Sequence, residues 1–278
     1  MNFRYSIWHY AAWLLLVVAG VGCAYVAKLP TVMPPVHLPP EAINRLGDWA
    51  FQLLLKTVDV SQNASDKEQV SKVANRIIKA AEGSKYADAA KQFKWEWTVI
   101  RDDEKRDAFA LPGGKIGVYT GLLRFTGENE AKLAVALAHE AVHALAQHAG
   151  ERISRMSEEL RRELAFAATG SQLLKEKRLS PQATAGVMVA MGLTYQGAVM
   201  FPFIREQESE ADHVGLLLMA RAGYNPQEAI DFWQQMGDGD ESSGSRMPEF
   251  LSTHLGYETR IKQLKDWMPE ALTVLREQ

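Results

Sequence analysis

The sequence has little cysteine and no excess of positive charge, and both absences exclude classes of protein. A single cysteine, Cys23, among 278 residues rules out an internal disulfide framework. The formal net charge of −3 provides no basic surface for nucleic acid, so we expect no nucleic-acid partner. With 47% hydrophobic and 23% charged residues, the composition is typical of a folded globular chain rather than a disordered one.

One uncharged apolar run near the N-terminus, AAWLLLVVAGVGCAYVA, extends from Ala11 to Ala27. It reaches the lower end of the roughly 17–25 residues that a membrane-spanning helix needs, and it also fits the apolar core of a secretory signal. Two interpretations stay open: an uncleaved membrane anchor, or a bacterial lipoprotein signal in which Cys23 receives lipid. Both predict an exported chain on the periplasmic side of a bacterial membrane.

Composition also suggests where the domain begins. We assign residues 1–28 to the signal or anchor and residues 29–40 to a stiff spacer, because the latter contains five prolines. Residues 41–278 then form one domain. Its first part shows helical spacing over 41–58 and 66–86, followed by strand-like alternation.

The fold class that these patterns predict is α+β and mainly helical. Residues 94–103 read as a strand, and residues 107–123 read as two strands joined by a Pro-Gly-Gly turn. We therefore expect a small antiparallel sheet of about three strands. The later helices are predicted over about 130–148, 151–178, 205–223, 225–236 and from 257 onward. An apolar, small-residue-rich segment at 183–203 is expected to be a packed or membrane-dipping helix rather than a second span.

The sequence His-Glu-Ala-Val-His, from His139 to His143, lies in the most apolar of these helices. Histidine and glutamate are costly to bury without partners. Two histidines four residues apart share one face of a helix, where their ring nitrogens can reach a single zinc ion. Glu140 can then act as a general base on a water at the metal. The motif predicts a metal hydrolase that binds one zinc ion per chain.

A catalytic zinc ion needs a third protein ligand. His148 lies five residues past His143 and points away from the pair if the helix continues, so we interpret it as a helix cap or a surface residue. The acidic run EQESEAD offers three carboxylates between which spacing alone does not decide: Glu206, Glu208 and Glu210.

Asp212 favours Glu208 as the ligand, because the two residues are four apart and share a helix face. The aspartate could accept a hydrogen bond from a ligand histidine and orient it. His213 is on a different face and is expected to be structural.

The motifs HEAVH and ESEAD, with AFALPGGKIGVYTGLL upstream, resemble the membrane-associated zinc metallopeptidase family of HtpX, BepA and the CAAX-prenyl proteases. The closest resemblance is to its Oma-type, periplasmic soluble-domain branch, and it covers residues 66–265. It implies a zincin-like (gluzincin) fold with an HExxH active-site helix, and a ligand at Glu208 with Asp212 as the second acid. It also implies that a strand containing Phe109, Ala110 and Leu111 binds substrate backbone in extended form.

The segment LSTHLGYETR resembles a downstream STHP…R motif of the same branch, with Leu255 in place of proline. The resemblance implies a site role for His254, which either stabilises the oxyanion or occupies the fourth zinc position and keeps the enzyme latent. Two roles stay open for Arg205 and Arg260: each could form a structural ion pair or contact the metal ligands.

We therefore expect a zinc-dependent metalloendopeptidase of cell-envelope protein quality control. Its substrates would be unfolded or misassembled envelope proteins, and its N-terminus would attach it to a membrane. An alternative is a latent or non-catalytic, chaperone-like envelope protein that holds zinc with four protein ligands. A metal hydrolase that does not cleave peptides is a third possibility.

Overall fold

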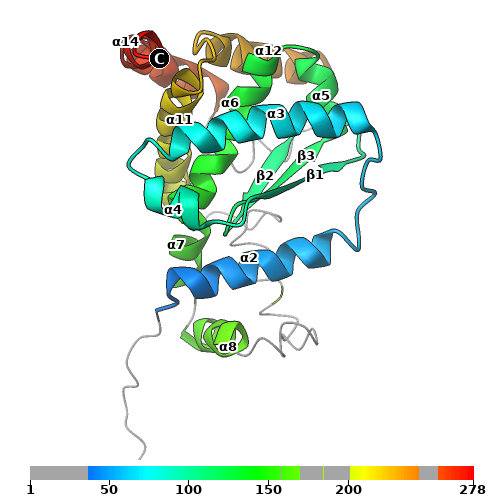
Figure 1. The fold of residues 1–278 in the computed structure, drawn as a ribbon, viewed down its shortest axis with the longest axis vertical. Coiled ribbons are helices and arrows are strands. Elements are labelled where there is room, and N and C mark those ends of the chain that lie inside the picture. Colours follow the sequence, from blue (N-terminus) through cyan, green and yellow to red (C-terminus); the bar gives the residue numbers. More distant parts are fainter. Residues whose placement is uncertain (1–36, 157, 170–183, 185–200, 244–255) are drawn as a thin grey trace, which may run out of the picture. The chain divides into compact units, whose positions relative to one another are not determined.

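The computed structural model describes residues 37–156, 158–169, 184, 201–243 and 256–278. Cys23, His254 and most of the segment 183–203 lie outside the described residues. The elements of Figure 1, in chain order, are α2 Pro40–Leu54, α3 Ala64–Ala81, α4 Ala87–Gln92, β1 Glu96–Ile100, β2 Ala108–Leu111, β3 Lys115–Tyr119, α5 Thr120–Thr126, α6 Glu130–Leu145, α7 His148–Ser154, α8 Glu158–Thr169, α11 Phe201–Arg221, α12 Glu228–Ser243 and α14 Tyr257–Arg276. The predicted mainly helical α+β class is confirmed.

The three strands form a mixed sheet in the order β1-β3-β2, which corrects the prediction of an antiparallel one. β2 and β3 are antiparallel and joined by a tight turn, in which Gly113 and Gly114 adopt φ values of 77° and 80° that glycine tolerates best. β1 pairs with the far side of β3 and runs parallel to it. Alternation along a strand shows that one face is buried, but it does not encode which neighbour the strand takes or in which direction. The parallel pair was therefore not visible in the sequence.

Helices cover both faces of the sheet, with α2 on one face and α3 and α6 on the other (Figure 1). The side chains of β2 alternate accordingly. Ala108 and Ala110 belong to the apolar cluster with α3 and α6, whereas Phe109 and Leu111 pack with α2. Small residues on the α6 side let β2 lie close to that helix. The result places an edge strand beside the HExxH helix.

The long helix predicted over 130–148 is two helices in the structure. α6 ends at Leu145, and Gln147 adopts a left-handed conformation with φ 60° and ψ 33° before α7 begins at His148. Such a conformation is uncommon for a residue other than glycine. The helix predicted over 151–178 is likewise divided, into α7 and α8. Among the described helices, none combines the length and the apolar character that crossing a membrane requires.

Candidate metal centre

Helix α6 carries the two predicted ligand histidines on its buried face. Asn129 caps the helix by accepting hydrogen bonds from the backbone N–H groups of Ala131 and Lys132. His139 and His143 are both buried, and their ring centres lie 4.8 Å apart in an edge-to-face arrangement. Residues four apart on a helix share one face, so both rings point to the same place.

Helix α11 brings a carboxylate to the same place. Of the three candidate glutamates, Glu208 is 1% exposed, Glu206 is exposed and Glu210 is partly exposed. α11 approaches α6 closely because Gly215 faces the backbone of His139. A Cβ atom at Gly215 would lie 3.1 Å from the His139 nitrogen, which is tighter than ordinary contact.

The structure brings the ligand groups together in a triangle whose corners are the Nε2 atoms of His139 and His143 and the carboxylate group of Glu208. Nε2 of His139 lies 3.1 Å from Nε2 of His143 and 3.2 Å from Oε2 of Glu208. Nε2 of His143 lies 3.2 Å from Oε1 of Glu208. Tetrahedral zinc with ligands at about 2.0–2.1 Å separates those ligands by about 3.3 Å. The donor set and its spacing therefore fit zinc.

Two buried residues hold this triangle from outside. Asp212, one turn after Glu208 on α11, places Oδ1 at 2.9 Å from Nδ1 of His139. Arg260 of α14 is 0% exposed and donates from Nε to Asp212 over 2.6 Å and from Nη2 to Glu208 over 3.2 Å. Its guanidinium also lies 3.9 Å above the ring of Trp233. The guanidinium group of Arg260 thus positions the carboxylates of both Glu208 and Asp212.

The protonation of the two histidines differs in the metal-free protein. Burial on its own lowers the pKa of His139, but the hydrogen bonds and charges of Asp212 and Glu208 outweigh burial and raise the pKa to about 10. Burial lowers the pKa of His143 well below its ordinary value. A divalent cation in the triangle would replace the proton of His139, because a ligand histidine must offer an unprotonated nitrogen.

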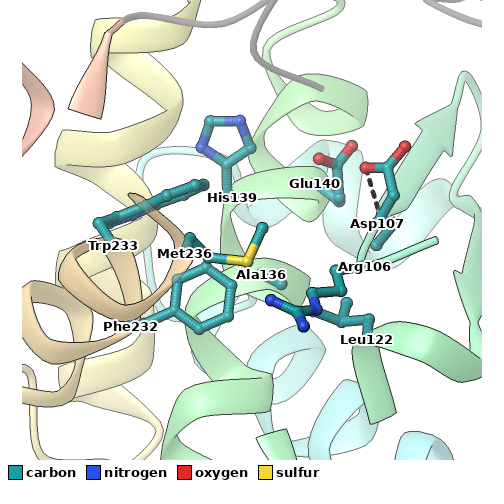
Figure 2. A pocket seen from close by; sticks show the side chains of 10 residues that line it. Arg106, Asp107, Leu122, Ala136, His139, Glu140, Phe232, Trp233 and Met236 are labelled. Carbon is teal, nitrogen blue, oxygen red and sulfur yellow. Dashed lines mark hydrogen bonds between the residues drawn. The ribbon is translucent and has the colours of Figure 1, made fainter. Parts of the chain in front are cut away.

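Glu140 lies between the ligand helix and the edge strand. Burial raises the pKa of its carboxyl to about 8, although the nearby His139 opposes this rise. The backbone N–H of Ala110 donates a hydrogen bond to Glu140, and Figure 2 shows its carboxylate beside that of Asp107. The side chain is therefore placed at the boundary between the metal ligands and the strand predicted to bind substrate.

His148 is not the cap or surface residue that the sequence predicted. It is 1% exposed, and its Nδ1 lies 2.7 Å from Nδ1 of His143. The prediction assumed that α6 continues through this position. Because Gln147 leaves the helical conformation, α7 starts in a new direction and the His148 ring turns back onto His143.

The remaining predicted residues lie apart from the triangle or outside the described residues. His213 faces away, pairs with Glu270 at 2.8 Å and stacks on Trp267 at 4.6 Å, as a structural residue would. Arg205 is exposed. Phe109, Ala110 and Leu111 lie in β2, the edge strand. For His254 and Cys23 the assigned roles stay predictions.

The sequence did not predict that Arg260 contacts Glu208 and Asp212. A signal for it exists, because two carboxylates one turn apart on a buried helix face require positive charge beyond one metal ion. The sequence offers 31 lysines and arginines, however, and nothing in their spacing selects the one on α14.

A helix with an HExxH motif that meets a ligand glutamate from a second helix defines a gluzincin, a class of zinc metallopeptidase fold. The family follows from comparison. The model of peptidase family M48 matches residues 64–268, which is more than half of the chain, so this chain belongs to family M48.

The relatives carry protease names. The mitochondrial metalloendopeptidase OMA1 of Schizosaccharomyces pombe is 35% identical over 202 residues, which is 73% of this chain and 53% of that protein. The OMA1 metalloendopeptidase of Homo sapiens is 31% identical over 66% of this chain and 34% of its own length. The beta-barrel assembly-enhancing protease of Escherichia coli is 28% identical over 80% of this chain and 43% of its own length. This chain thus spans about half the length of these relatives, or less.

Proposed function

We propose that this chain is a zinc-dependent metalloendopeptidase that binds one zinc ion through His139, His143 and Glu208. The observation that carries the proposal is the buried triangle of ligand groups: the two Nε2 atoms lie 3.1 Å apart, and each lies 3.2 Å from one oxygen of the Glu208 carboxylate. Membership of family M48 and the names of the relatives support it. When bound, zinc supplies Lewis-acid chemistry, since it acidifies water and polarises a carbonyl group.

The protein's own groups account for the proton transfers of peptide hydrolysis. Glu140 accepts a proton from the attacking water and returns it to the leaving amine. Burial raises the pKa of this carboxyl in the metal-free protein, and the positive charge of a bound zinc ion would favour the ionised form that a general base requires. Asp212 and Arg260 keep the ligands in place and take no proton in this scheme.

β2 is the outer strand of the sheet that the described residues form, and its outer edge suits a substrate in extended conformation. The backbone N–H of Tyr119 donates to the carbonyl of Asp107 over 3.1 Å, so these two residues form a hydrogen-bonded pair of the ladder. Pairs alternate along antiparallel strands, and Ala108 and Ala110 therefore direct their backbone groups away from β3. The N–H of Ala108 already donates to the side chain of Asp107 over 2.8 Å, and the N–H of Ala110 donates to Glu140. An added substrate strand would therefore pair first with the two carbonyl groups, and it would have to displace these carboxylates to pair with the N–H groups. This favours unfolded segments as substrates.

A small pocket with mainly apolar walls lies beside His139 and Glu140 (Figure 2). It has space for about one water molecule, so a substrate side chain enters it only if the walls move apart. Its walls come from α5, α6 and α12, and the apolar residues among them are Leu122, Ala136, Phe232, Trp233 and Met236. Arg106 and Asp107 add charge. A substrate strand on β2 would place alternate side chains toward α6, since successive side chains point to opposite faces.

The cellular role that we propose is quality control of unfolded or misassembled proteins in a bacterial cell envelope. The name of the Escherichia coli relative, a beta-barrel assembly-enhancing protease, supports this setting for the present chain. Export and attachment to a membrane, through an uncleaved anchor or a lipid on Cys23, are part of the same proposal and rest on the N-terminal sequence. Mass spectrometry of the mature N-terminus distinguishes a lipidated Cys23 from an intact Met1.

Casein digestion by the full-length protein tests the activity. We expect cleavage that a chelator stops and added zinc restores. Glu140→Gln is the matched variant, because it keeps all three ligands and removes only the base. It should bind zinc like the wild type and lose at least about 100-fold in rate, the lower end for a lost general base. Undiminished cleavage by this variant would remove Glu140 from its role.

The chaperone-like alternative is tested with His254→Ala in the same assay. Activity in both proteins supports an active peptidase, and activity in the variant alone indicates a latent one that His254 blocks. A folded, zinc-loaded protein that cleaves nothing in either form would favour the non-catalytic binding role.

A further inference from the structure

His148 joins the metal centre to a chain of polar groups that extends from the buried ligands toward the protein surface. Its Nδ1 lies 2.7 Å from Nδ1 of His143, and its Nε2 lies 3.3 Å from Oε2 of Glu210. The rings of the two histidines meet edge to face, with centres 4.8 Å apart. The His148 ring is thus held between a ligand histidine and a carboxylate.

The direction of each hydrogen bond in this chain follows from metal binding. Nε2 of His143 points into the ligand triangle, 3.2 Å from Glu208, and must be unprotonated to bind the ion. A neutral imidazole carries its proton on the other nitrogen, so Nδ1 of His143 is the donor. Nδ1 of His148 must then accept. His148 consequently carries its own proton on Nε2 and donates it to Glu210.

Glu210 connects these polar groups to the segment that precedes α4. Its Oε1 accepts a hydrogen bond from the hydroxyl of Tyr86 over 2.7 Å and from the ammonium group of Lys85 over 3.2 Å. Tyr86 precedes α4, Glu210 lies in α11 and His148 begins α7. Groups from three separate parts of the chain are therefore connected to His143, a metal ligand on α6. Glu210 was one of the three carboxylates that the sequence offered as the third metal ligand. In the structure it contacts His148 and lies outside the ligand triangle.

We propose that His148 is a positioning residue for the metal. It fixes the tautomer and the ring orientation of His143, and Glu210 with Tyr86 fixes His148 in turn. The proposal rests on the proposed zinc site. The two ligand histidines are then oriented by different chemistry. A charged carboxylate, Asp212, accepts from His139, whereas a neutral imidazole accepts from His143. Loss of an orienting group of this kind costs about 10–100-fold in metal affinity.

Zinc affinity of the full-length protein, measured by competition with a chromophoric chelator, tests the role of His148. His148→Leu fills similar space but accepts no hydrogen bond, and we expect its zinc affinity to fall about 10–100-fold. His148→Asn places an amide oxygen near the position of Nδ1 and should regain most of that loss. A purely space-filling role would give the opposite order. His213→Leu, which removes a histidine bound to Glu270 outside the site, is the control and should match the wild type.

A measurement on the unmutated protein complements the variants. Nitrogen-15 NMR of the zinc-loaded chain should show His148 protonated on Nε2 and unprotonated on Nδ1. The reverse tautomer, or a His148→Leu variant that binds zinc as tightly as the wild type, would overturn the inference while leaving the zinc site intact. A wild-type protein that binds no zinc would instead overturn the proposed function, and the inference with it.

Discussion

Arg260 binds the ligand glutamate and its neighbouring acid simultaneously: Nη2 lies 3.2 Å from Oε2 of Glu208, and Nε lies 2.6 Å from Oδ2 of Asp212. All three side chains are at most 4% exposed. Two buried carboxylates on one helix face repel each other, and Arg260 supplies a permanent positive charge between them. The arginine thus stabilises the site whether or not a metal is present.

Replacing Arg260 with methionine should therefore destabilise the metal-free protein strongly. Breaking a buried ion pair from one side costs about 3–5 kcal/mol, because an uncompensated charge stays behind. Denaturant-induced unfolding of the metal-free protein measures this loss. Zinc should offset part of it, since the ion replaces some of the missing positive charge.

Lys262 provides the control for that experiment. It lies on the same helix, its side chain is 78% exposed and it pairs with Asp266. Lys262→Met should change the free energy of unfolding by less than about 1 kcal/mol, because exposed ion pairs contribute little. Equal losses in the two variants would mean that Arg260 contributes no more than a surface charge.

The parts of the site that could be predicted are those set by local helix geometry. His139 with His143, and Glu208 with Asp212, are both pairs four residues apart, and a helix places such pairs on one face whatever surrounds it. The sequence therefore gave enough information to propose which groups meet. It could not order the three carboxylates by spacing, and Asp212 was needed to favour Glu208.

The parts that could not be predicted depend on single backbone conformations or on distant elements. One left-handed residue, Gln147, reverses the expected position of His148. The parallel pairing of β1 with β3 depends on how the chain crosses the sheet. Arg260 reaches the site from a helix 48 residues after Asp212. None of these relationships leaves a periodic pattern in the sequence.

Zinc affinity should distinguish the three glutamates in the first half of α11, which are Glu206, Glu208 and Glu210. Glu208→Gln keeps the shape of the side chain but removes its charge from the triangle. Its loss of zinc affinity should exceed the roughly 10–100-fold that loss of an outer contact costs. Glu206→Gln, on the exposed side of the same helix, should bind zinc like the wild type. The assignment of Glu208 would be wrong if Glu206→Gln or Glu210→Gln caused the larger loss.

The buried carboxyl of Glu140 should make the stability of the metal-free protein depend on pH. Its pKa rises from an ordinary value of 4.5 to about 8 on folding. Between these pH values the folded protein holds a proton that the unfolded chain has released, so the free energy of unfolding falls as pH rises. Glu140→Gln lacks this contribution. Its stability relative to the wild type should therefore increase from pH 5 to pH 8, by on the order of a few kcal/mol.

Urea unfolding of the two metal-free proteins at several pH values measures that difference. The raised pKa of His139 also lowers stability at high pH, but it is present in both proteins and largely cancels. Parallel pH profiles for wild type and Glu140→Gln would show that the carboxyl titrates normally.

Gly215 should be required for the close approach of the two ligand helices. A Cβ atom there would lie 3.1 Å from the nitrogen and 3.3 Å from the Cα of His139, both backbone atoms that cannot rotate away. Gly215→Val must push α11 from α6, which moves Glu208 and Asp212 relative to His139. We expect a loss of about 1–3 kcal/mol in stability, typical of overpacking, together with weaker zinc binding. Gly256→Ala is the control, since no atom of the described residues lies within 4 Å of its added Cβ. Wild-type zinc affinity in Gly215→Val would show that the triangle tolerates a wider helix spacing, because the added methyl groups leave every ligand in place.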